Sequence, residues 1–288
     1  MSQIKEIAVV GAGQMGSGIA QVCASSGFQV RMQDISQESL DRAQGVIEKS
    51  LDRLVKKEKI SAEQKQSCLS NITTSTKVED LASCDLLIEA ATENVDLKLS
   101  LFSRFDQLIK KDAILASNTS SISITKIAGV TQRPEKVIGM HFMNPVPIMK
   151  LVEVINGLRT SEETTQTVLE LSKAIGKTTV TAKDFPGFLV NRILCPMINE
   201  AVFALESGIA SPKDIDAAMK LGTNQPMGPL ELADFVGLDT VLAIMEVLHE
   251  GLGEDKYRPA PLLRQYVEAG LYGRKSGQGF YEYTGGNS

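Results

Sequence analysis

His141 and Glu153 are the residues of this sequence best suited to move a proton. His141 is one of two histidines in the chain, and a histidine side chain titrates near neutral pH, so it can act as a general base. Glu153 lies in the apolar segment LVEVI, where a carboxylate must be paired or neutral. If the chain returns beside His141, Glu153 orients the imidazole and stabilises its protonated form. The alternative is that His141 is structural and Glu153 lies on the outward face of an edge strand.

A glycine-rich turn with the spacing of a dinucleotide-binding site follows the first predicted strand. It consists of Gly11, Ala12, Gly13, Gln14, Met15 and Gly16. The first glycine permits a tight turn, the second lets the backbone approach a pyrophosphate, and the third allows a helix to pack closely on the strand. The phosphates then lie at a helix N-terminus, where N–H groups and the helix dipole favour negative charge. Glycines also mark ordinary turns, so this spacing alone is a weak signal.

Asp34 strengthens the nucleotide interpretation and indicates which nucleotide binds. It ends the second predicted strand, where a carboxylate can accept hydrogen bonds from the ribose hydroxyl groups. The same carboxylate repels a 2′-phosphate, and the next residues, 35–37 (ISQ), offer no arginine for that phosphate. The sequence therefore predicts NAD as the cofactor, and Arg31 on the same strand keeps NADP open as the second choice.

Polar residues follow three further predicted strands. Glu93 follows the fourth strand, segment 118–121 (NTSS) follows the fifth, and segment 141–144 (HFMN) follows the sixth. Ligands of an open parallel sheet bind beyond the carboxyl ends of its strands, so these side chains are expected to converge on one edge. The alternative is that Asn, Ser and Thr only satisfy the backbone of turns, which is their commonest role.

A basic segment follows Asp34 in a predicted helical hairpin. Its six basic residues are Lys49, Arg53, Lys56, Lys57, Lys59 and Lys65, against three acids in the same stretch. A charge run is usually a solvated face. In a chain of negative net charge, this local excess of positive charge can instead bind the phosphate groups of a substrate.

Alternating strands and helices must position these residues. The predicted strands are 4–10, 28–34, 71–76, 85–91, 113–117, 137–142, 151–156 and 177–182. Helices are expected from Met15 to Ser26, through 40–55, and after the N-cap Ser61. Such alternation predicts an α/β Rossmann-like domain with a mostly parallel sheet that is covered on both faces.

The pattern changes after segment 184–187 (DFPG). Segment 186–208 (PGFLVNRILCPMINEAVFALESG) reads as one helix with Pro186 in its first turn. Further helices are expected to begin at Ser211-Pro212 and Pro229. The helix from 230 is expected to end near His249, which then serves as a C-terminal cap. We therefore divide the chain into a Rossmann-like domain, 1–187, with a helical hairpin insertion, and an all-α domain, 188–288.

Composition excludes several classes of protein. The net charge of −5 and 43% hydrophobic residues are typical of a globular protein and give no basic surface for nucleic acid. The four cysteines form no CxxC pair and no histidine lies near them, so neither a metal site nor a disulfide framework is expected. Segment 7–30 has no charge, but its glycines and polar residues argue against a membrane anchor. We expect a cytoplasmic protein.

Several longer motifs show that the sequence resembles the short-chain L-3-hydroxyacyl-CoA dehydrogenases. They are GAGQMGSGIA, IEAATENVDLK, ASNTSS, HFMNPVPIMKLVEVI, DFPGFLVNRIL, DIDAAMKLGTNQPMGPLELADFVGLD and GRKSGQGFYEY. The resemblance covers nearly the whole chain. The HFMNPVP segment followed by LVEV, and PGFLVNR, are far more specific than the glycine turn.

The resemblance implies roles for individual residues. His141 is the general base, Glu153 orients it, and Ser120 and Asn191 hydrogen-bond the substrate. The adenosine and pyrophosphate of NAD bind at Gly11 to Gly16 and Asp34. The residues at the ribose and nicotinamide end, with one further nucleotide contact in the C-terminal segment, are Glu93, Lys98, Ser120, Asn144 and Lys275. Ser50 and Lys57 are implied to contact coenzyme A, and the all-α domain to form a homodimer.

These residues predict NAD-dependent interconversion of a 3-hydroxyacyl-CoA, such as 3-hydroxybutyryl-CoA, and the 3-ketoacyl-CoA, such as acetoacetyl-CoA. Two alternatives stay open at this point. The same apparatus can oxidise a free sugar acid, as a gulonate dehydrogenase does, in which case coenzyme A is not needed. A dinucleotide-binding protein without turnover is the other alternative, although such a protein does not need the pair His141 and Glu153.

Overall fold

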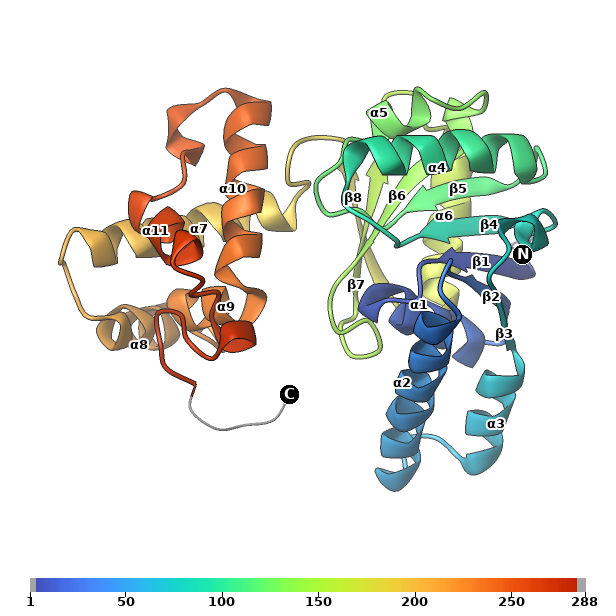
Figure 1. Ribbon diagram of the computed structural model, residues 1–288, viewed down its shortest axis with the longest axis horizontal. Coiled ribbons are helices and arrows are strands. Elements are labelled where there is room, and N and C mark those ends of the chain that lie inside the picture. Colours follow the sequence, from blue (N-terminus) through green and yellow to red (C-terminus); the bar gives the residue numbers. More distant parts are fainter. Residues whose placement is uncertain (1–3, 284–288) are drawn as a thin grey trace. The chain divides into compact units, whose positions relative to one another are not determined.

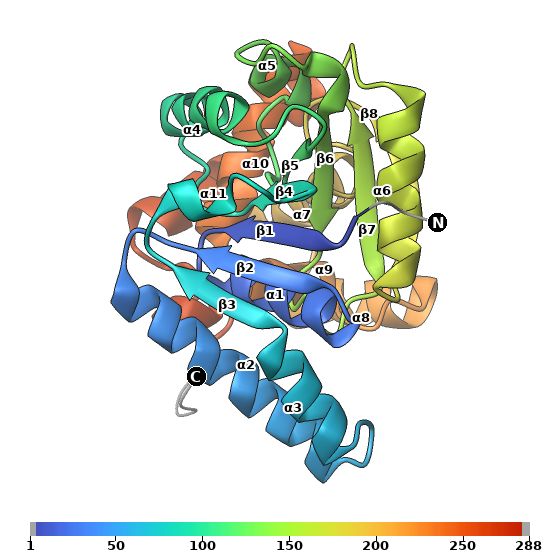
Figure 2. The same cartoon turned by 90° about the vertical axis from the view of Figure 1, so that its right-hand side faces the viewer.

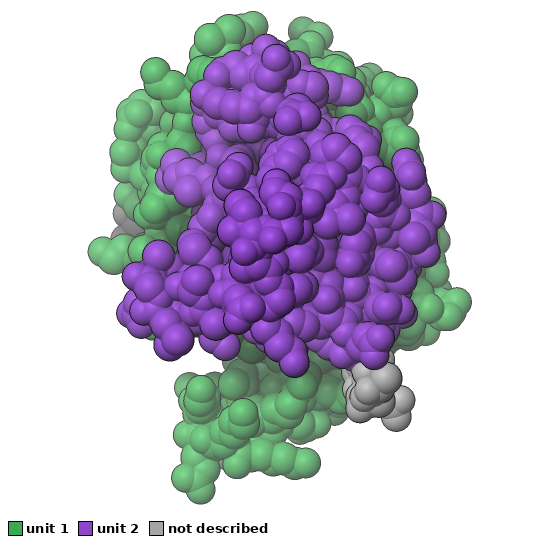
Figure 3. Space-filling view, turned by 90° about the vertical axis from the view of Figure 1, so that its left-hand side faces the viewer, with its two compact units in different colours: residues 1–185 green, residues 186–288 purple. Residues whose placement is uncertain are grey.

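The computed structural model describes residues 4–283 and divides the chain into two compact units, Met1–Phe185 and Pro186–Ser288. Figure 3 shows the two units in separate colours. The division falls between Phe185 and Pro186, two residues before the boundary placed by the sequence. No helix of the described part is both long and apolar enough to cross a bilayer.

Unit 1 contains an eight-stranded sheet in the order β3-β2-β1-β4-β5-β6-β7-β8 (Figure 2). The strands are β1 (Glu6–Val10), β2 (Gln29–Gln33), β3 (Ile72–Ser75), β4 (Leu86–Glu89), β5 (Ile114–Ser117), β6 (Val137–Phe142), β7 (Leu151–Asn156) and β8 (Thr178–Lys183). All neighbouring strands run parallel except β6 and β7, which pair antiparallel. The predicted mostly parallel sheet is thus confirmed, and its carboxyl edge gathers the ends of β1 to β6.

Helices connect these strands, and most of them begin at a side-chain cap. Those of unit 1 are α1 (Gln14–Ser25), α2 (Gln37–Lys56), α3 (Ala62–Ser70), α4 (Val95–Leu108), α5 (Ile124–Ala128) and α6 (Glu162–Ala174), with short 3₁₀ turns at Val78–Leu81 and Pro134–Lys136. Ser36 and Ser61 cap α2 and α3 through their hydroxyl groups. Asn94 caps α4 through its amide oxygen. Capping satisfies N–H groups that have no partner inside the helix, and it fixes where each helix starts.

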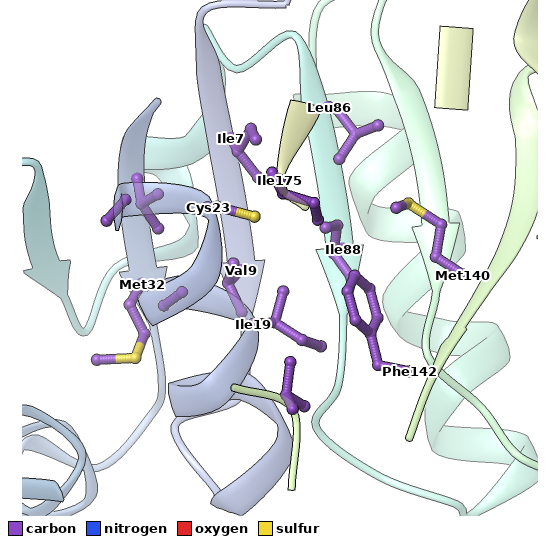
Figure 4. Close-up of a cluster of buried hydrophobic side chains, with 14 of the residues drawn as sticks. Ile7, Val9, Ile19, Cys23, Met32, Leu86, Ile88, Met140, Phe142 and Ile175 are labelled. Atoms are coloured by element: carbon purple, nitrogen blue, oxygen red, sulfur yellow. The ribbon is translucent and has the colours of Figure 1, made fainter. Parts of the chain in front are cut away.

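The core of unit 1 explains why these segments pair as they do (Figure 4). Ile7 and Val9 of β1 and Ile88 of β4 form one cluster with Ile19 of α1, and all four are fully buried. The alternate residues of the same strands are buried as well. Side chains of a strand point to opposite faces in turn, so both faces of the sheet are covered, as expected for parallel strands.

Helices α2 and α3 extend from the sheet as an arm (Figure 1). Ser61 and Gln64 at the start of α3 form a capping box, in which each side chain accepts from the other residue's backbone N–H. Lys65 of α3 pairs with Glu48 and Asp52 of α2. The arm is thereby held as one hairpin.

Unit 2 is helical, and its own apolar core holds it together. Its helices are α7 (Val190–Glu206), α8 (Pro212–Thr223), α9 (Pro229–Val236), α10 (Leu238–Leu252) and α11 (Pro261–Glu268), with 3₁₀ turns at Asp255–Tyr257 and Arg274–Ser276. The starts of α8 and α9 agree with the sequence predictions. Buried side chains of α7, α9 and α10 face one another across this core.

Two predictions for unit 2 are wrong in detail. Pro186 does not lie in the first turn of a helix, because Gly187 (φ +73°) and Phe188 (φ +51°) take left-handed backbone conformations and α7 begins only at Val190. The helix expected from 230 to 249 is two helices, because Gly237 has φ +104°, which helical residues do not adopt. His249 lies in the last turn of α10, consistent with the predicted position near a helix C-terminus.

Candidate active site

The glycine turn between β1 and α1 fits a dinucleotide. A Cβ atom on Gly16 would lie 1.8 Å from the carbonyl oxygen of Gly11, so only glycine allows α1 to approach the strand this closely. A Cβ on Gly11 would lie 2.6 Å from the carbonyl oxygen of Ala90, and Gly11 has φ +99°. Gly13 has nothing within 4 Å of its Cβ position, and no side chain caps α1 there. The turn is thus closed toward the protein and open at Gly13, where a pyrophosphate can meet the first turn of the helix.

Asp34 is held at the carboxyl end of β2, beside this turn. Its Oδ2 atom accepts from the N–H of Ala12 at 2.8 Å, and its Oδ1 atom accepts from the N–H of Ser36 at 3.0 Å. The carboxylate is half-buried. It is therefore oriented by the backbone while part of it meets solvent, which suits a group that accepts hydrogen bonds from ribose.

The structure brings His141 and Glu153 into direct contact. Their strands, β6 and β7, pair antiparallel, and the two residues lie opposite each other in the register. The Nδ1 atom of His141 is 2.7 Å from the Oε2 atom of Glu153, and Glu153 is fully buried. A carboxylate at Nδ1 favours the tautomer with its proton on that nitrogen, which puts the lone pair on Nε2. The pair has the geometry of a base and its orienting acid.

The loops after β4 and β5 are joined through Glu93 and Ser120. The carboxylate of Glu93 accepts from the N–H of Ser120 at 2.8 Å, from its hydroxyl group at 3.2 Å, and from the hydroxyl group of Thr119 at 2.7 Å. Asn118 links the next strand, since its Oδ1 atom accepts from the N–H of Phe142 at 2.9 Å. Three strand ends are therefore tied together beside His141.

A buried ion pair below these loops was not predicted. Lys98 of α4 donates to Glu89 at the end of β4, and Ser117 at the end of β5 donates to the same carboxylate at 2.9 Å. The side chains of Lys98 and Glu89 are at most 1% exposed. The sequence carried a signal for Glu89, because it stands in the apolar run DLLIEAA much as Glu153 stands in LVEVI. Lys98, implied to bind the cofactor, is directed at Glu89 and Ser117.

A pocket of about 490 Å³ lies between α1, α2 and the loop after β6. Ser50, Lys57 and Asn144 line it, together with Gln14 of the glycine turn. Arg53 and Lys59 line it as well, and the sequence had singled them out only as members of the basic segment. Lys65, by contrast, is paired with acids of the arm. Three of the six basic residues thus face one pocket that continues from the expected nucleotide site.

Family models match both units of the chain. Residues 6–185 match the NAD-binding domain of 3-hydroxyacyl-CoA dehydrogenase, and residues 187–283 match its C-terminal domain. The chain belongs to the 3-hydroxyacyl-CoA dehydrogenase family. Membership in this family confirms the resemblance drawn from the sequence motifs and the expected order of an NAD-binding Rossmann-like domain and a helical domain.

Relatives within the family match along almost the whole chain. The probable 3-hydroxybutyryl-CoA dehydrogenase of Deinococcus radiodurans is 58% identical, over 96% of this chain and 99% of the relative. The 3-hydroxybutyryl-CoA dehydrogenase of Clostridioides difficile is 52% identical, over 97% of this chain and 99% of the relative. The crystal structure of (S)-3-hydroxybutyryl-CoA dehydrogenase from Ralstonia eutropha is similar with a TM-score of 0.96 and 54% identity, covering 98% of this chain and all of that one.

Two residues that the family resemblance implies lie in unit 2. Asn191 is the second residue of α7 and is half-buried. Lys275 is exposed in the 3₁₀ turn Arg274–Ser276, where its ammonium group pairs with Asp239 of α10. Gly237 makes room for that lysine, since a Cβ there would lie 2.6 Å from the Lys275 Nζ atom. The contacts of Asn191 and Lys275 with substrate and nucleotide stay predictions.

Proposed function

We propose that the protein is an NAD-dependent (S)-3-hydroxyacyl-CoA dehydrogenase that interconverts 3-hydroxybutyryl-CoA and acetoacetyl-CoA. The observation that carries the proposal is the contact between His141 and Glu153 at the carboxyl edge of a nucleotide-binding sheet. A base at that edge lies where the ligands of such sheets bind. The identity to dehydrogenases named for this substrate supports the same reaction.

In the oxidation, His141 removes the proton of the substrate's 3-hydroxyl group at Nε2. Glu153 holds the ring by its Nδ1 atom and stabilises the imidazolium that forms. The bound NAD supplies the hydride acceptor for carbon 3. Ser120 and Asn191 donate hydrogen bonds to substrate oxygens and so fix the carbon against the cofactor. In the reduction, His141 returns the proton to the forming alkoxide.

The cofactor is assigned from the glycine turn and Asp34 of unit 1. We place the pyrophosphate at Gly13, where the turn is open, and the adenosine ribose at Asp34. Because a carboxylate repels a 2′-phosphate, Asp34 favours NAD over NADP. Glu93 and Asn144 are placed at the second ribose and the nicotinamide, since both belong to loops at the same sheet edge.

The pocket of α2 is the proposed site of coenzyme A. Arg53, Lys57 and Lys59 give it positive charge, and Ser50 supplies a hydroxyl group. The adenosine phosphates of coenzyme A carry several negative charges, which such a pocket attracts. Val146, Pro147 and Ile148 add apolar surface for the pantetheine arm.

The proposed chemistry is tested by replacing each histidine in turn. His141→Gln should lower kcat with acetoacetyl-CoA and NADH by about 10²–10⁴-fold, because the general base is lost, and leave the Kd of NADH unchanged. His249→Gln is the control, since His249 lies in unit 2 at the end of α10. Both are measured by NADH absorbance. Turnover close to wild type in His141→Gln would remove His141 from the reaction.

The coenzyme A pocket separates this function from oxidation of a free sugar acid. Lys57→Ala and Ser50→Ala should each raise the KM for acetoacetyl-CoA by about tenfold, because each removes a contact to a charged group. Lys49→Ala is the matched control, since Lys49 is exposed on the same helix and does not line the pocket. An unchanged KM in the pocket variants would favour a substrate without coenzyme A.

We also propose a cytoplasmic homodimer. Unit 2 exposes several large apolar side chains, namely Ile193, Ile209, Leu221 and Phe235. Such side chains favour association when they form a patch. The four cysteines are buried free thiols, which suits a reducing compartment. Light scattering of the purified protein measures the subunit number.

A further inference from the structure

We propose that Glu89 is a positioning residue for the nicotinamide-ribose end of the cofactor. Its buried carboxylate holds Lys98 and the two loops that carry Glu93 and Ser120. The inference rests on the proposed function, since it assumes that NAD binds at this sheet edge with its nicotinamide ribose beside those loops.

Both carboxylate oxygens of Glu89 accept hydrogen bonds from residues at the carboxyl edge of the sheet. Its Oε1 atom accepts from the N–H of Ala91 at 2.9 Å and of Thr92 at 3.3 Å. Its Oε2 atom accepts from the ammonium group of Lys98 and from the hydroxyl group of Ser117 at 2.9 Å. One side chain thereby fixes the loop after β4, the start of α4 and the end of β5.

The network continues to the predicted cofactor residues. The Ser117 hydroxyl oxygen accepts from the N–H of Thr119 at 3.2 Å, and the Thr119 hydroxyl group donates to Glu93 at 2.7 Å. Glu93 in turn accepts from the backbone of Ser120 at 2.8 Å. A chain of hydrogen bonds therefore runs from the buried ion pair to both loops at the sheet edge.

Stability alone does not account for this ion pair. Glu89 is fully buried and Lys98 is 1% exposed, and removing two charges from water costs several kcal/mol per ion before their attraction repays it. Replacing such a pair by apolar residues is often neutral or stabilising. The pair is better explained by the geometry it imposes, since the four groups that donate to Glu89 belong to the loop after β4, to α4 and to β5 rather than to one element.

The adenosine end of the cofactor depends on other residues. Asp34 directly follows β2 and is oriented by the N–H groups of Ala12 and Ser36, and Gly13 directly precedes α1. Loss of the Glu89 carboxylate should therefore weaken a ligand that reaches the second ribose and leave a ligand that ends at the pyrophosphate unaffected. NADH and ADP are ligands of these two kinds.

The experiment compares NADH and ADP binding in Glu89→Gln. NADH is titrated by its fluorescence, and ADP by its competition with NADH. We expect the Kd of NADH to rise about tenfold and that of ADP to stay within about twofold. The second variant Ser117→Ala leaves the ion pair of Lys98 and Glu89 in place and breaks the link from Glu89 to Thr119, so it should show the same selective loss of NADH if Glu89→Gln fails to fold.

Asp106→Asn is the matched control. Asp106 and Arg133 form a second buried ion pair, and Asp106 lies on the same helix, α4, in its last turn. We expect it to lower the Tm as Glu89→Gln does, without changing the Kd of NADH. Equal weakening of NADH and ADP, no weakening of either, or the same loss of NADH in Asp106→Asn would overturn the proposal. The binding measurements do not require turnover. If the wild-type protein binds NADH but does not reduce acetoacetyl-CoA, the proposed reaction is wrong, and the role of Glu89 in cofactor binding is still tested.

Discussion

Gly13 and Gly16 stand three residues apart in one turn and meet opposite surroundings. Gly16 has the carbonyl oxygen of Gly11 where its Cβ would be, whereas Gly13 has open space. Gly16 is needed to fold the turn. Gly13 is needed only if a ligand must approach the backbone from outside, and a pyrophosphate is such a ligand.

Alanine at the two positions should separate folding from binding. Gly16→Ala should lower the free energy of unfolding by about 2 kcal/mol or more, because the backbone of Gly11 must move. Gly13→Ala should change it by less than about 1 kcal/mol yet raise the Kd of NADH about tenfold. Urea unfolding and NADH fluorescence measure the two quantities. Normal NADH binding by Gly13→Ala would argue against a pyrophosphate at this turn.

At the level of single residues, the sequence predicted those whose chemistry is unusual for their surroundings. A carboxylate in an apolar strand needs a partner, and that argument led from Glu153 to His141. It applies equally to Glu89, but the partner there is a lysine on the following helix, which strand alternation does not reveal. Likewise, charge alone did not show which of the basic residues face a pocket and which, like Lys65, are paired within the arm.

At the level of secondary structure, Asp85 fastens the beginnings of two central strands. It stands directly before β4, and its Oδ2 atom accepts from the N–H groups of Lys5 at 2.7 Å and Glu6 at 2.9 Å. Burial favours the neutral acid, but the hydrogen bonds from Lys110 and from the backbone of Glu6 and Lys5 outweigh it and lower the pKa of Asp85 below its ordinary value. The ionised form thus stabilises the pairing of β1 with β4.

This lowered pKa predicts how stability depends on pH. A carboxyl group with a lowered folded-state pKa stabilises the protein above its unfolded-state pKa, and the contribution is lost as the pH falls through the folded-state value. Asp85→Asn should therefore cost about 1 kcal/mol at neutral pH and less at an acidic pH well below 3.8, the ordinary pKa of aspartate, where Asp85 becomes protonated in the folded protein. Urea unfolding of both proteins at the two pH values provides the comparison. An equal loss at both would show that charge is not the cause.

The boundaries of strands and helices were predictable where a local signal fixed them. Ser61 as an N-cap, and Pro212 and Pro229 in first turns, place helix starts as the structure has them. Periodicity did not reveal the break at Gly237, because the apolar pattern continues from α9 into α10. Periodicity also did not show that α7 begins only at Val190. The residue that delays the helix start is Phe188, whose left-handed conformation is uncommon for a non-glycine residue.

At the level of the whole molecule, residues with a proposed role occur in both units. His141, Glu153 and Ser120 belong to unit 1, whereas Asn191 belongs to α7 of unit 2. Each unit has its own apolar core. The proposed substrate contacts of Ser120 and Asn191 therefore come from parts of the chain that fold around separate cores.

Asn191→Ala should therefore reduce catalysis without affecting the nucleotide. We expect kcat/KM for acetoacetyl-CoA to fall about tenfold, as for the loss of one substrate hydrogen bond, while the Kd of NADH stays unchanged. Glu200→Gln, exposed on the same helix, is the control and should resemble the wild type. A weaker NADH complex in Asn191→Ala would mean that this residue acts on the nucleotide instead of the substrate.

The antiparallel pairing of β6 with β7 makes the proposed dyad a cross-strand pair in the interior of the sheet. Side chains alternate along a strand, so a slip of one residue would turn Glu153 to the far face and abolish the contact. The contact therefore depends on the register in which Gly139–Phe142 pair with Val152–Ile155. A substitution that shifted this ladder would separate the two side chains even if both were left unchanged.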